Sequence, residues 1–294
     1  MEKFLHSRAY SFTFTSSQMD SFPNLDYMKQ ATFCWPRDRP NHVLGIRNQG
    51  STKSSYAFSV VNTIYADLFP ALQDESSRGI NLHNLSPSEA SEGSPQELID
   101  FLHLTKLPFG RAQGDEPGES GWANNFDGAF SYVQKWGLFR ECQYRFVGKY
   151  QKDIKRVTYC PEWKISIKKF KEIDEENDEK RYRAIVEQLT NQPLTGSILM
   201  AESLRNWRYT DGIYQGLTDE ERRSTRHAKL AITLIGYGTE ENKQDYYWVQ
   251  SSSPETSNFI QVRRDLISKI FYPVGSHIKQ MTESVFDKLR KPTN

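Results

Sequence analysis

The stretch Asn48-Gln-Gly-Ser-Thr-Lys-Ser-Ser-Tyr-Ala-Phe-Ser59 leads directly into the clearest helix of the chain. From Ser54 to Leu68, apolar residues recur at three- and four-residue spacing, which is typical of a helix with one buried face. The hydroxyl residues Thr52, Ser54 and Ser55 offer N-cap side chains where this helix begins. The apolar face consists of Tyr56, Ala57, Val60, Val61, Ile64, Tyr65 and Leu68.

The two halves of the chain differ in pattern. Two further helical segments, at about 95–103 and 126–136, follow in the first half. The second half holds one helix around 182–189 among strand-like segments rich in Val, Ile, Tyr and Trp. These patterns predict an α+β protein with a helical N-terminal lobe, a β-rich C-terminal lobe and a cleft between them. The predicted strands are 163–170, 194–200, 227–236, 245–250 and 258–263.

Composition excludes several classes of protein. The chain has 294 residues, a formal net charge of +1, 37% hydrophobic and 26% charged residues, which suits a globular protein and gives no reason to expect a nucleic-acid partner. No apolar run is long enough for a membrane span, and the polar N-terminus does not resemble a signal peptide. We therefore expect a cytoplasmic or nuclear protein, with a transit peptide in the Ser/Thr-rich stretch 7–17 as the alternative.

The cysteines and histidines indicate neither a disulfide framework nor a metal site. Cys34, Cys142 and Cys160 are the three cysteines of the chain, an odd and sparse set. The histidines show no ligand spacing, so we expect no metal and no cofactor.

The opening stretch resembles the segment around the nucleophile of papain-like cysteine peptidases, Asn-Gln-Gly-Ser-Cys-Gly-Ser-Cys-Trp-Ala-Phe-Ser. Eight of the twelve residues agree, in register, and a helix follows as the family requires. Further matches keep family order from about Trp35 to Val274. They include Gln96–Asp100 (Gln-Glu-Leu-Val-Asp in the family), Gly118–Trp122 (the Gly-Cys-Asn-Gly-Gly loop), His227–Thr239 (His-Ala…Gly-Tyr-Gly) and Tyr246–Ser253 (Tyr-Trp-x-Val-Lys-Asn-Ser-Trp).

The resemblance implies a two-lobed papain-like fold and a set of site residues. Ser55 stands at the position of the nucleophilic cysteine, His227 at that of the histidine, and Gln49 at that of the oxyanion-hole glutamine. Ser251 stands where the family has the asparagine that orients the histidine, and Ser253 replaces the tryptophan beside it. A serine needs a base held in the right orientation, so two concurrent changes argue against peptide hydrolysis.

Two further replacements alter the substrate groove implied by the resemblance. Lys53 takes the place of a glycine before the nucleophile, and Trp122 takes the place of the last glycine of the Gly-Cys-Asn-Gly-Gly loop. Side chains at these positions would narrow or reshape a groove in which glycines allow a substrate backbone to approach closely. The family disulfides are absent as well, because Thr52, Phe101 and Glu119 replace three of the bridging cysteines.

These features lead to one main hypothesis and two alternatives. The main hypothesis is a catalytically inactive papain-like homologue, a pseudopeptidase whose inter-lobe cleft binds a protein or peptide. The alternatives are a weak hydrolase that uses Ser55 and His227, and a decaying paralogue without a selected activity. We expect a short leader at 1–32 in place of a full propeptide, a papain-like domain at 33–274 with lobes at about 45–150 and 155–270, and a tail at 275–294.

Overall fold

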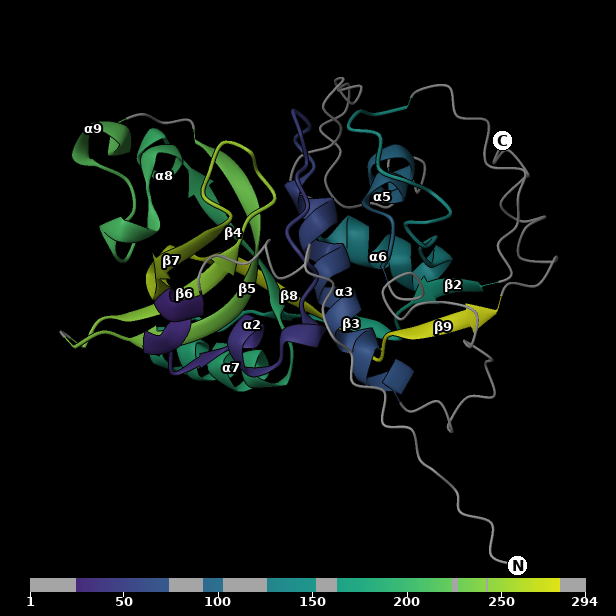
Figure 1. Cartoon of the computed structure of the whole chain (residues 1–294), viewed down its shortest axis with the longest axis horizontal. Helices are drawn as coiled ribbons and strands as arrows, with labels where there is room; N and C mark the ends of the chain where they lie inside the picture. The colour runs from purple at the N-terminus through teal and green to yellow at the C-terminus, as the bar shows by residue number, and fades with distance from the viewer. Residues whose placement is uncertain are drawn as a thin grey trace, which may run out of the picture.

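The computed structural model describes residues 25–73, 92–102, 126–151, 163–223, 227–241 and 243–280. It combines helices with a large antiparallel sheet, so the fold is α+β (Figure 1). Within these ranges, no helix has both the length and the apolar character needed to cross a membrane.

One lobe is mainly helical. Its helices are α3 (Ser55–Gln73), α5 (Pro95–Phe101) and α6 (Phe126–Trp136), and α3 lies between the other two and the large sheet (Figure 1). A two-stranded antiparallel sheet completes this lobe, formed by β2 (Trp163–Ser166) and β9 (His277–Gln280).

The other lobe is built on a seven-stranded antiparallel sheet. Its strand order is β3-β8-β4-β5-β6-β7, and the short β1 pairs with the C-terminal part of β5. The strands are β1 (Phe33–Cys34), β3 (Lys169–Ile173), β4 (Leu194–Met200), β5 (Ala228–Thr239), β6 (Asp245–Gln250), β7 (Phe259–Arg263) and β8 (Ser268–Val274).

Helix α7 (Asp178–Asn191) packs against β5 and β3. The sheet lobe also carries short helices at its edges, among them α8 and α9 at one end (Figure 1). These are η1 (Leu25–Gln30), α2 (Trp35–Asp38), η2 (Pro40–His42), α8 (Glu202–Asn206), η5 (Tyr209–Asp211), α9 (Asp219–Arg222) and η6 (Arg264–Leu266).

Each lobe has its own hydrophobic core. The sheet lobe packs around residues such as Trp248, Leu234 and Ile260, and the helical lobe packs around residues such as Tyr56 and Phe130. The sheet contributes to both cores, because Ala231 of β5 and Phe271 of β8 belong to the helical-lobe core. Side chains alternate between the faces of a strand, so one sheet can serve two cores.

Most predicted elements occur where the sequence placed them, with shifted ends. The helix predicted over 182–189 begins earlier, at Asp178, because the Asn177 side chain accepts a hydrogen bond from the Lys180 amide and caps it. Met28, within the expected leader, is fully buried in the sheet-lobe core. The expected tail contains β9, whose Ile278 pairs with Ile165 of β2.

A buried ion pair lies inside the helical lobe. The Glu97 carboxylate accepts hydrogen bonds from the Lys164 ammonium and the Tyr132 hydroxyl, both at 2.7 Å, and from the Phe139 amide. The Glu97 and Lys164 side chains are 1% and 4% exposed. The Lys164 ammonium also lies over the Phe139 ring, 4.1 Å from its centroid. The ion pair therefore links α5 to β2, and its further hydrogen bonds reach Tyr132 of α6 and Phe139 after that helix. Both charged side chains are almost completely shielded from bulk water.

Replacing one partner of this ion pair should destabilise the helical lobe. Glu97→Gln should lower the free energy of unfolding by about 3–5 kcal/mol, because it leaves the Lys164 charge buried and uncompensated. Urea denaturation would measure the loss. Glu97→Leu combined with Lys164→Met should recover most of it, and a double variant no more stable than Glu97→Gln would contradict this account.

Candidate functional site

Gln49 ties the loop before α3 to the loop that follows β6. Its side-chain amide donates to the Thr52 carbonyl at 2.6 Å, and its side-chain carbonyl accepts from the Ser252 hydroxyl at 2.9 Å. Its backbone amide also donates to the Ser252 carbonyl at 2.9 Å. Both ends of the buried Gln49 carboxamide thus have partners within the protein.

Ser55 is the first residue of α3, and its hydroxyl is directed at β5. The oxygen accepts a hydrogen bond from the Ala231 amide at 3.1 Å, and the residue is only 5% exposed. The contact gives a buried amide of the sheet a hydrogen-bond acceptor from α3. In this geometry the hydroxyl acts as a structural acceptor between the lobes.

The Ser55 contact is the first of a row along α3. Ser55, Ser59, Asn62 and Thr63 are four, three and one residues apart, so they lie on one face of the helix. We call these four side chains, three hydroxyls and the Asn62 carboxamide, the hydroxyl stripe. Ser59 donates to the Ile232 carbonyl at 2.7 Å, and the Thr63 hydroxyl lies 3.1 Å from that of Thr195 in β4. Asn62 reaches Gln250 of β6 at 3.4 Å.

His227 lies just before β5 and is engaged elsewhere. Its Nε2 is 2.8 Å from the Glu221 carbonyl oxygen in α9. Among the described residues, no hydrogen bond joins His227 to Ser55. The two side chains that the sequence paired therefore have different hydrogen-bond partners in the structure, the Glu221 carbonyl for His227 and the Ala231 amide for Ser55.

Helix α9, whose Glu221 carbonyl contacts the His227 ring, is itself fixed by a carboxylate. Glu221 accepts hydrogen bonds from the amide and hydroxyl of Ser203 and from the amide of Thr218. Burial opposes ionisation, but these hydrogen bonds from Ser203 and Thr218 prevail and lower the pKa of Glu221 to about 2. Helix α9 is capped by the ionised Glu221 side chain, and the backbone carbonyl of the same residue holds the His227 ring.

Ser251 and Ser253 satisfy each other within their own loop. The Ser251 hydroxyl lies 2.9 Å from the Thr256 hydroxyl and accepts from the Ser253 amide at 3.1 Å. The Ser253 hydroxyl accepts from the Glu255 amide at 3.3 Å. Both serines are buried, and neither bonds His227 in the described part of the chain. The Ser251 hydroxyl therefore does not orient that imidazole.

The structure describes one of the two predicted groove residues. Lys53 is exposed, two residues before α3 begins. Trp122 lies outside the described residues. Within those residues, no group of three or more His, Cys, Asp or Glu side chains is placed to hold a metal ion.

A sequence model of the papain family, described as "Papain family cysteine protease", matches residues 31–257. This match spans both lobes, α3 and the loop after β6. The chain belongs to the papain family of cysteine proteases.

Solved structures of the papain family share the fold. Bromelain from Ananas comosus, in complex with the E64 inhibitor, is 19% identical with a TM-score of 0.54, over 84% of this chain and 99% of that one. The proform of the ragweed pollen allergen Amb a 11 cysteine protease is 18% identical with a TM-score of 0.53, over 87% of this chain and 70% of that one. No curated protein sequence matches the chain.

Within this papain-family fold, two contacts were not predicted from the sequence. The Ala231 contact of Ser55 is hidden because His227-Ala228 resembles the family's histidine motif. The Ser252 contact of Gln49 is hidden because a serine in a loop shows no pattern that indicates its partner. One signal was available in the sequence: the hydroxyl stripe recurs at helical spacing within an otherwise apolar helix.

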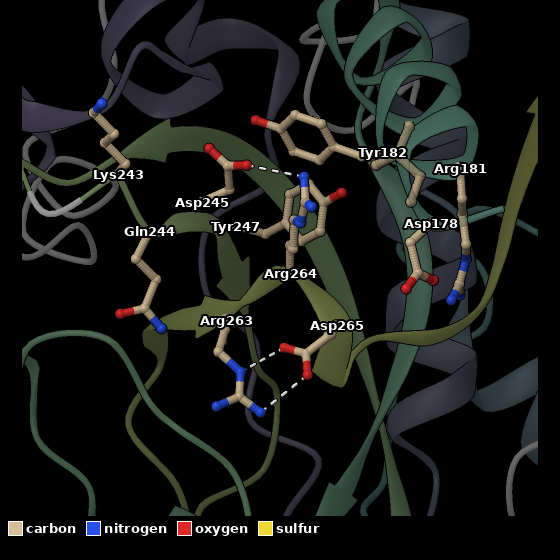
Figure 2. Close-up of a pocket in the computed structure, with 11 residues that line it drawn as sticks. Asp178, Arg181, Tyr182, Lys243, Gln244, Asp245, Tyr247, Arg263, Arg264 and Asp265 are labelled. Atoms are coloured by element: carbon tan, nitrogen blue, oxygen red, sulfur yellow. Dashed lines mark hydrogen bonds and ion pairs between the residues drawn. The ribbon is translucent and has the colours of Figure 1, made fainter.

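A charged pocket of about 380 Å³ lies on the sheet lobe between α7, the β5–β6 hairpin and the end of β7 (Figure 2). Arg264 bridges Asp245 and Glu179 and lies over the Tyr182 ring, 4.8 Å from its centroid. Arg263 donates to both carboxylate oxygens of Asp265, through its Nε and its Nη2 (Figure 2). The lining carboxylates thus already engage two of the lining guanidinium groups, and none of the predicted site residues lines the pocket.

Removing the Ser55 hydroxyl should weaken the contact between the lobes. Ser55→Ala removes a hydrogen-bond acceptor from the buried Ala231 amide, which should lower the free energy of unfolding by about 1–3 kcal/mol. Chemical denaturation beside Ser51→Ala, a change at an exposed position of the same loop, gives the measurement and its control. Equal stability of Ser55→Ala and the unmodified protein would show that the contact contributes nothing.

The cysteines should remain free thiols of unequal reactivity. Cys34 is buried, and burial raises its pKa to about 12, whereas Cys142 is exposed; Cys160 lies outside the described residues. Iodoacetamide at pH 8 should therefore modify Cys142 quickly and Cys34 only after unfolding. Peptide mapping identifies the modified residue, and an intact mass lower by the two hydrogens of a disulfide would contradict the prediction.

Proposed function

We propose that this chain is a catalytically inactive member of the papain family that acts by binding a protein or peptide. The observation that carries the proposal is the hydrogen bond from the Ala231 amide to the Ser55 hydroxyl. It makes the side chain at the predicted nucleophile position an acceptor for the neighbouring strand.

A serine nucleophile requires a base within hydrogen-bond reach to take its proton. The residues of β5 that adjoin the Ser55 hydroxyl are Leu230 and Ala231, and neither carries an ionisable group. His227, the base expected from sequence, bonds the Glu221 carbonyl instead. Among the described residues, the Ser55 hydroxyl therefore has no hydrogen-bonded base that would activate it.

The Gln49 side chain, the predicted oxyanion-hole donor, already uses part of its hydrogen-bonding capacity within the protein. One N–H of the Gln49 carboxamide is used by the Thr52 carbonyl at 2.6 Å, and the Ser252 hydroxyl fixes the other end of the group. Transition-state stabilisation depends on donors aimed at the developing oxyanion. A Gln49 amide held by its own loop supports a structural role for that side chain.

Binding is the function that remains for the site. Lys53 is exposed next to the first turn of α3, close in sequence to the rigid Gln49 loop. A fixed loop with a projecting cation gives a preformed surface, which lowers the entropy lost on binding. We expect the partner to contact the surface near Gln49 and Lys53, where the family's substrate cleft would be.

The unmodified protein should not cleave peptides measurably. A fluorogenic peptide library and a fluorophosphonate probe test it directly, with Ser55→Ala as the matched control. We expect hydrolysis and labelling of both proteins to equal the buffer background. Labelling of Ser55 that disappears in His227→Ala would support the weak serine hydrolase instead and would overturn the proposal.

A further inference from the structure

We propose that the charged pocket between α7, the β5–β6 hairpin and the end of β7 binds a ligand that carries a single carboxylate on a small apolar or aromatic body. The cavity has a volume of about 380 Å³, which is within the range of small-molecule sites in proteins. It is a second site, apart from the surface near Gln49 and Lys53, and neither of these residues lines it.

One face of α7 forms a wall of the pocket. The lining residues of this helix follow one another at intervals of three, one and three, so they share one face. They are Asp178, Arg181, Tyr182 and Ile185. Ile185 is buried, and the Tyr182 ring lies 6.1 Å from the ring of Tyr247 in β6, which is buried as well. The pocket therefore has an apolar and aromatic side that can contact the body of a ligand.

Polar contacts between the walls hold the pocket in shape. Arg264, after β7, bonds Asp245 of β6 at 2.9 Å and also pairs with Glu179 of α7. The Arg181 guanidinium reaches from α7 to the Ile267 carbonyl at 2.9 Å. These links connect all three walls before any ligand arrives, and a preformed site loses less entropy on binding.

Arg181 is the guanidinium group available to an anion. Its contact within the described residues is with the neutral Ile267 carbonyl, through Nη2, and no ion pair there engages it. Arg263 and Arg264, by contrast, already contact carboxylates. The remaining N–H groups of Arg181 keep the fork geometry that matches a carboxylate with two hydrogen bonds.

The Tyr247 hydroxyl is a second donor at the same place. Its ring is 1% exposed, and in the part of the chain that the structure describes the hydroxyl has no hydrogen-bond partner. Figure 2 shows this hydroxyl directed toward α7, beside the Arg264 guanidinium. Burial raises the pKa of Tyr247, and the charges of Arg181 and Arg264 oppose this rise, which indicates that both cations are near the hydroxyl. A phenol and a guanidinium that face one cavity favour a ligand with acceptor oxygens.

The carboxylates of the pocket restrict the charge of the ligand. Asp178, Asp245 and Asp265 all line it, so the negative groups nearly balance the four cations. A diphosphate or another polyanion would place several negative charges beside these carboxylates, which is unfavourable. A single carboxylate needs only the Arg181 charge, and the apolar side of the pocket then accepts the rest of the molecule.

The experiment is isothermal titration calorimetry of the full chain with phenylacetate, which has one carboxylate on an aromatic ring. Phenylacetamide has nearly the same shape without the charge, so phenylacetate should bind at least about tenfold more tightly. Equal affinity for the two compounds, or no binding of phenylacetate, would overturn the proposal. Tighter binding of tripolyphosphate than of phenylacetate would contradict the assignment of a single carboxylate.

A carboxylate of this kind can belong to a free small molecule or to the C-terminus of a peptide. N-acetylglycylphenylalanine and its C-terminal amide separate these sources. Binding of the peptide acid but not of its amide would make a peptide C-terminus the source. Binding of phenylacetate without the peptide acid would make it a free carboxylate. Either result upholds the pocket as a carboxylate site.

Variants locate the binding in this pocket. Arg181→Gln should weaken phenylacetate binding at least about tenfold, because it removes the charged donor. The matched control is Arg183→Gln, the same change at an exposed position of α7 that does not line the pocket, and it should bind as the unmodified protein does. Equal affinities of these two variants would overturn the assignment of Arg181.

Arg181→Gln also removes the bond to the Ile267 carbonyl, so thermal melting checks its fold. Tyr247→Phe keeps the buried ring and removes only the hydroxyl, which makes it the second test if Arg181→Gln is unstable. It should weaken phenylacetate binding about threefold or more, since a hydrogen bond to a charged group is lost. Unchanged affinity of Tyr247→Phe would overturn the role of the hydroxyl. None of these measurements depends on the hydrolysis assay that tests the proposed function.

Discussion

The contact between α3 and the large sheet is the constraint on which the structure depends. One face of α3 is apolar and packs into the helical lobe, and the other carries the hydroxyl stripe that faces β4, β5 and β6. Short polar side chains let the helix approach the strands closely while satisfying buried polar groups. Because these hydrogen bonds are directional, they fix how the two lobes meet more tightly than apolar contact alone would.

This constraint changes the meaning of Ser55. In a cysteine protease the residue at the start of this helix must be free to react, whereas here its hydroxyl is the first member of the stripe and accepts a hydrogen bond from Ala231. A side chain that completes a buried interface is stabilised in one position. The same geometry that makes Ser55 useful to the fold removes it from the chemistry expected of its position.

The polar contacts of the molecule fall into two kinds. The Glu97–Lys164 pair is buried and joined to further hydrogen-bond donors, so its integrity bears on the stability of the helical lobe. The ion pairs of Arg263 and Arg264 border an open pocket, and water and salt screen them. These ion pairs connect the β5–β6 hairpin, α7 and the end of β7. Each contributes less to the free energy of unfolding than the buried Glu97–Lys164 pair.

The fold class and the bounds of several elements follow from local patterns in the sequence. Helix α6 occurs at Phe126–Trp136 as the periodicity predicted, and β4 and β6 match their predicted ranges. Such signals are local, because helices and strands impose their own spacing on apolar residues. The motif around Gln49 and Ser55 likewise identified the family, since a short run of residues in fixed order needs no tertiary information.

Contacts between residues far apart in the chain follow from the tertiary arrangement. His227 and Ser55 appear paired when motifs are matched one at a time, but in the structure His227 contacts the Glu221 carbonyl and the Ala231 amide bonds the Ser55 hydroxyl. The partners of Gln49 and Ser251 were equally hidden, because a hydroxyl in a loop can bond any nearby group. A shift of a few residues along a strand is invisible in composition, yet each residue moves a side chain by about 3.3 Å and to the other face. That is why the sequence could identify the family, whereas the side chains beside Ser55 were set by the register of β5.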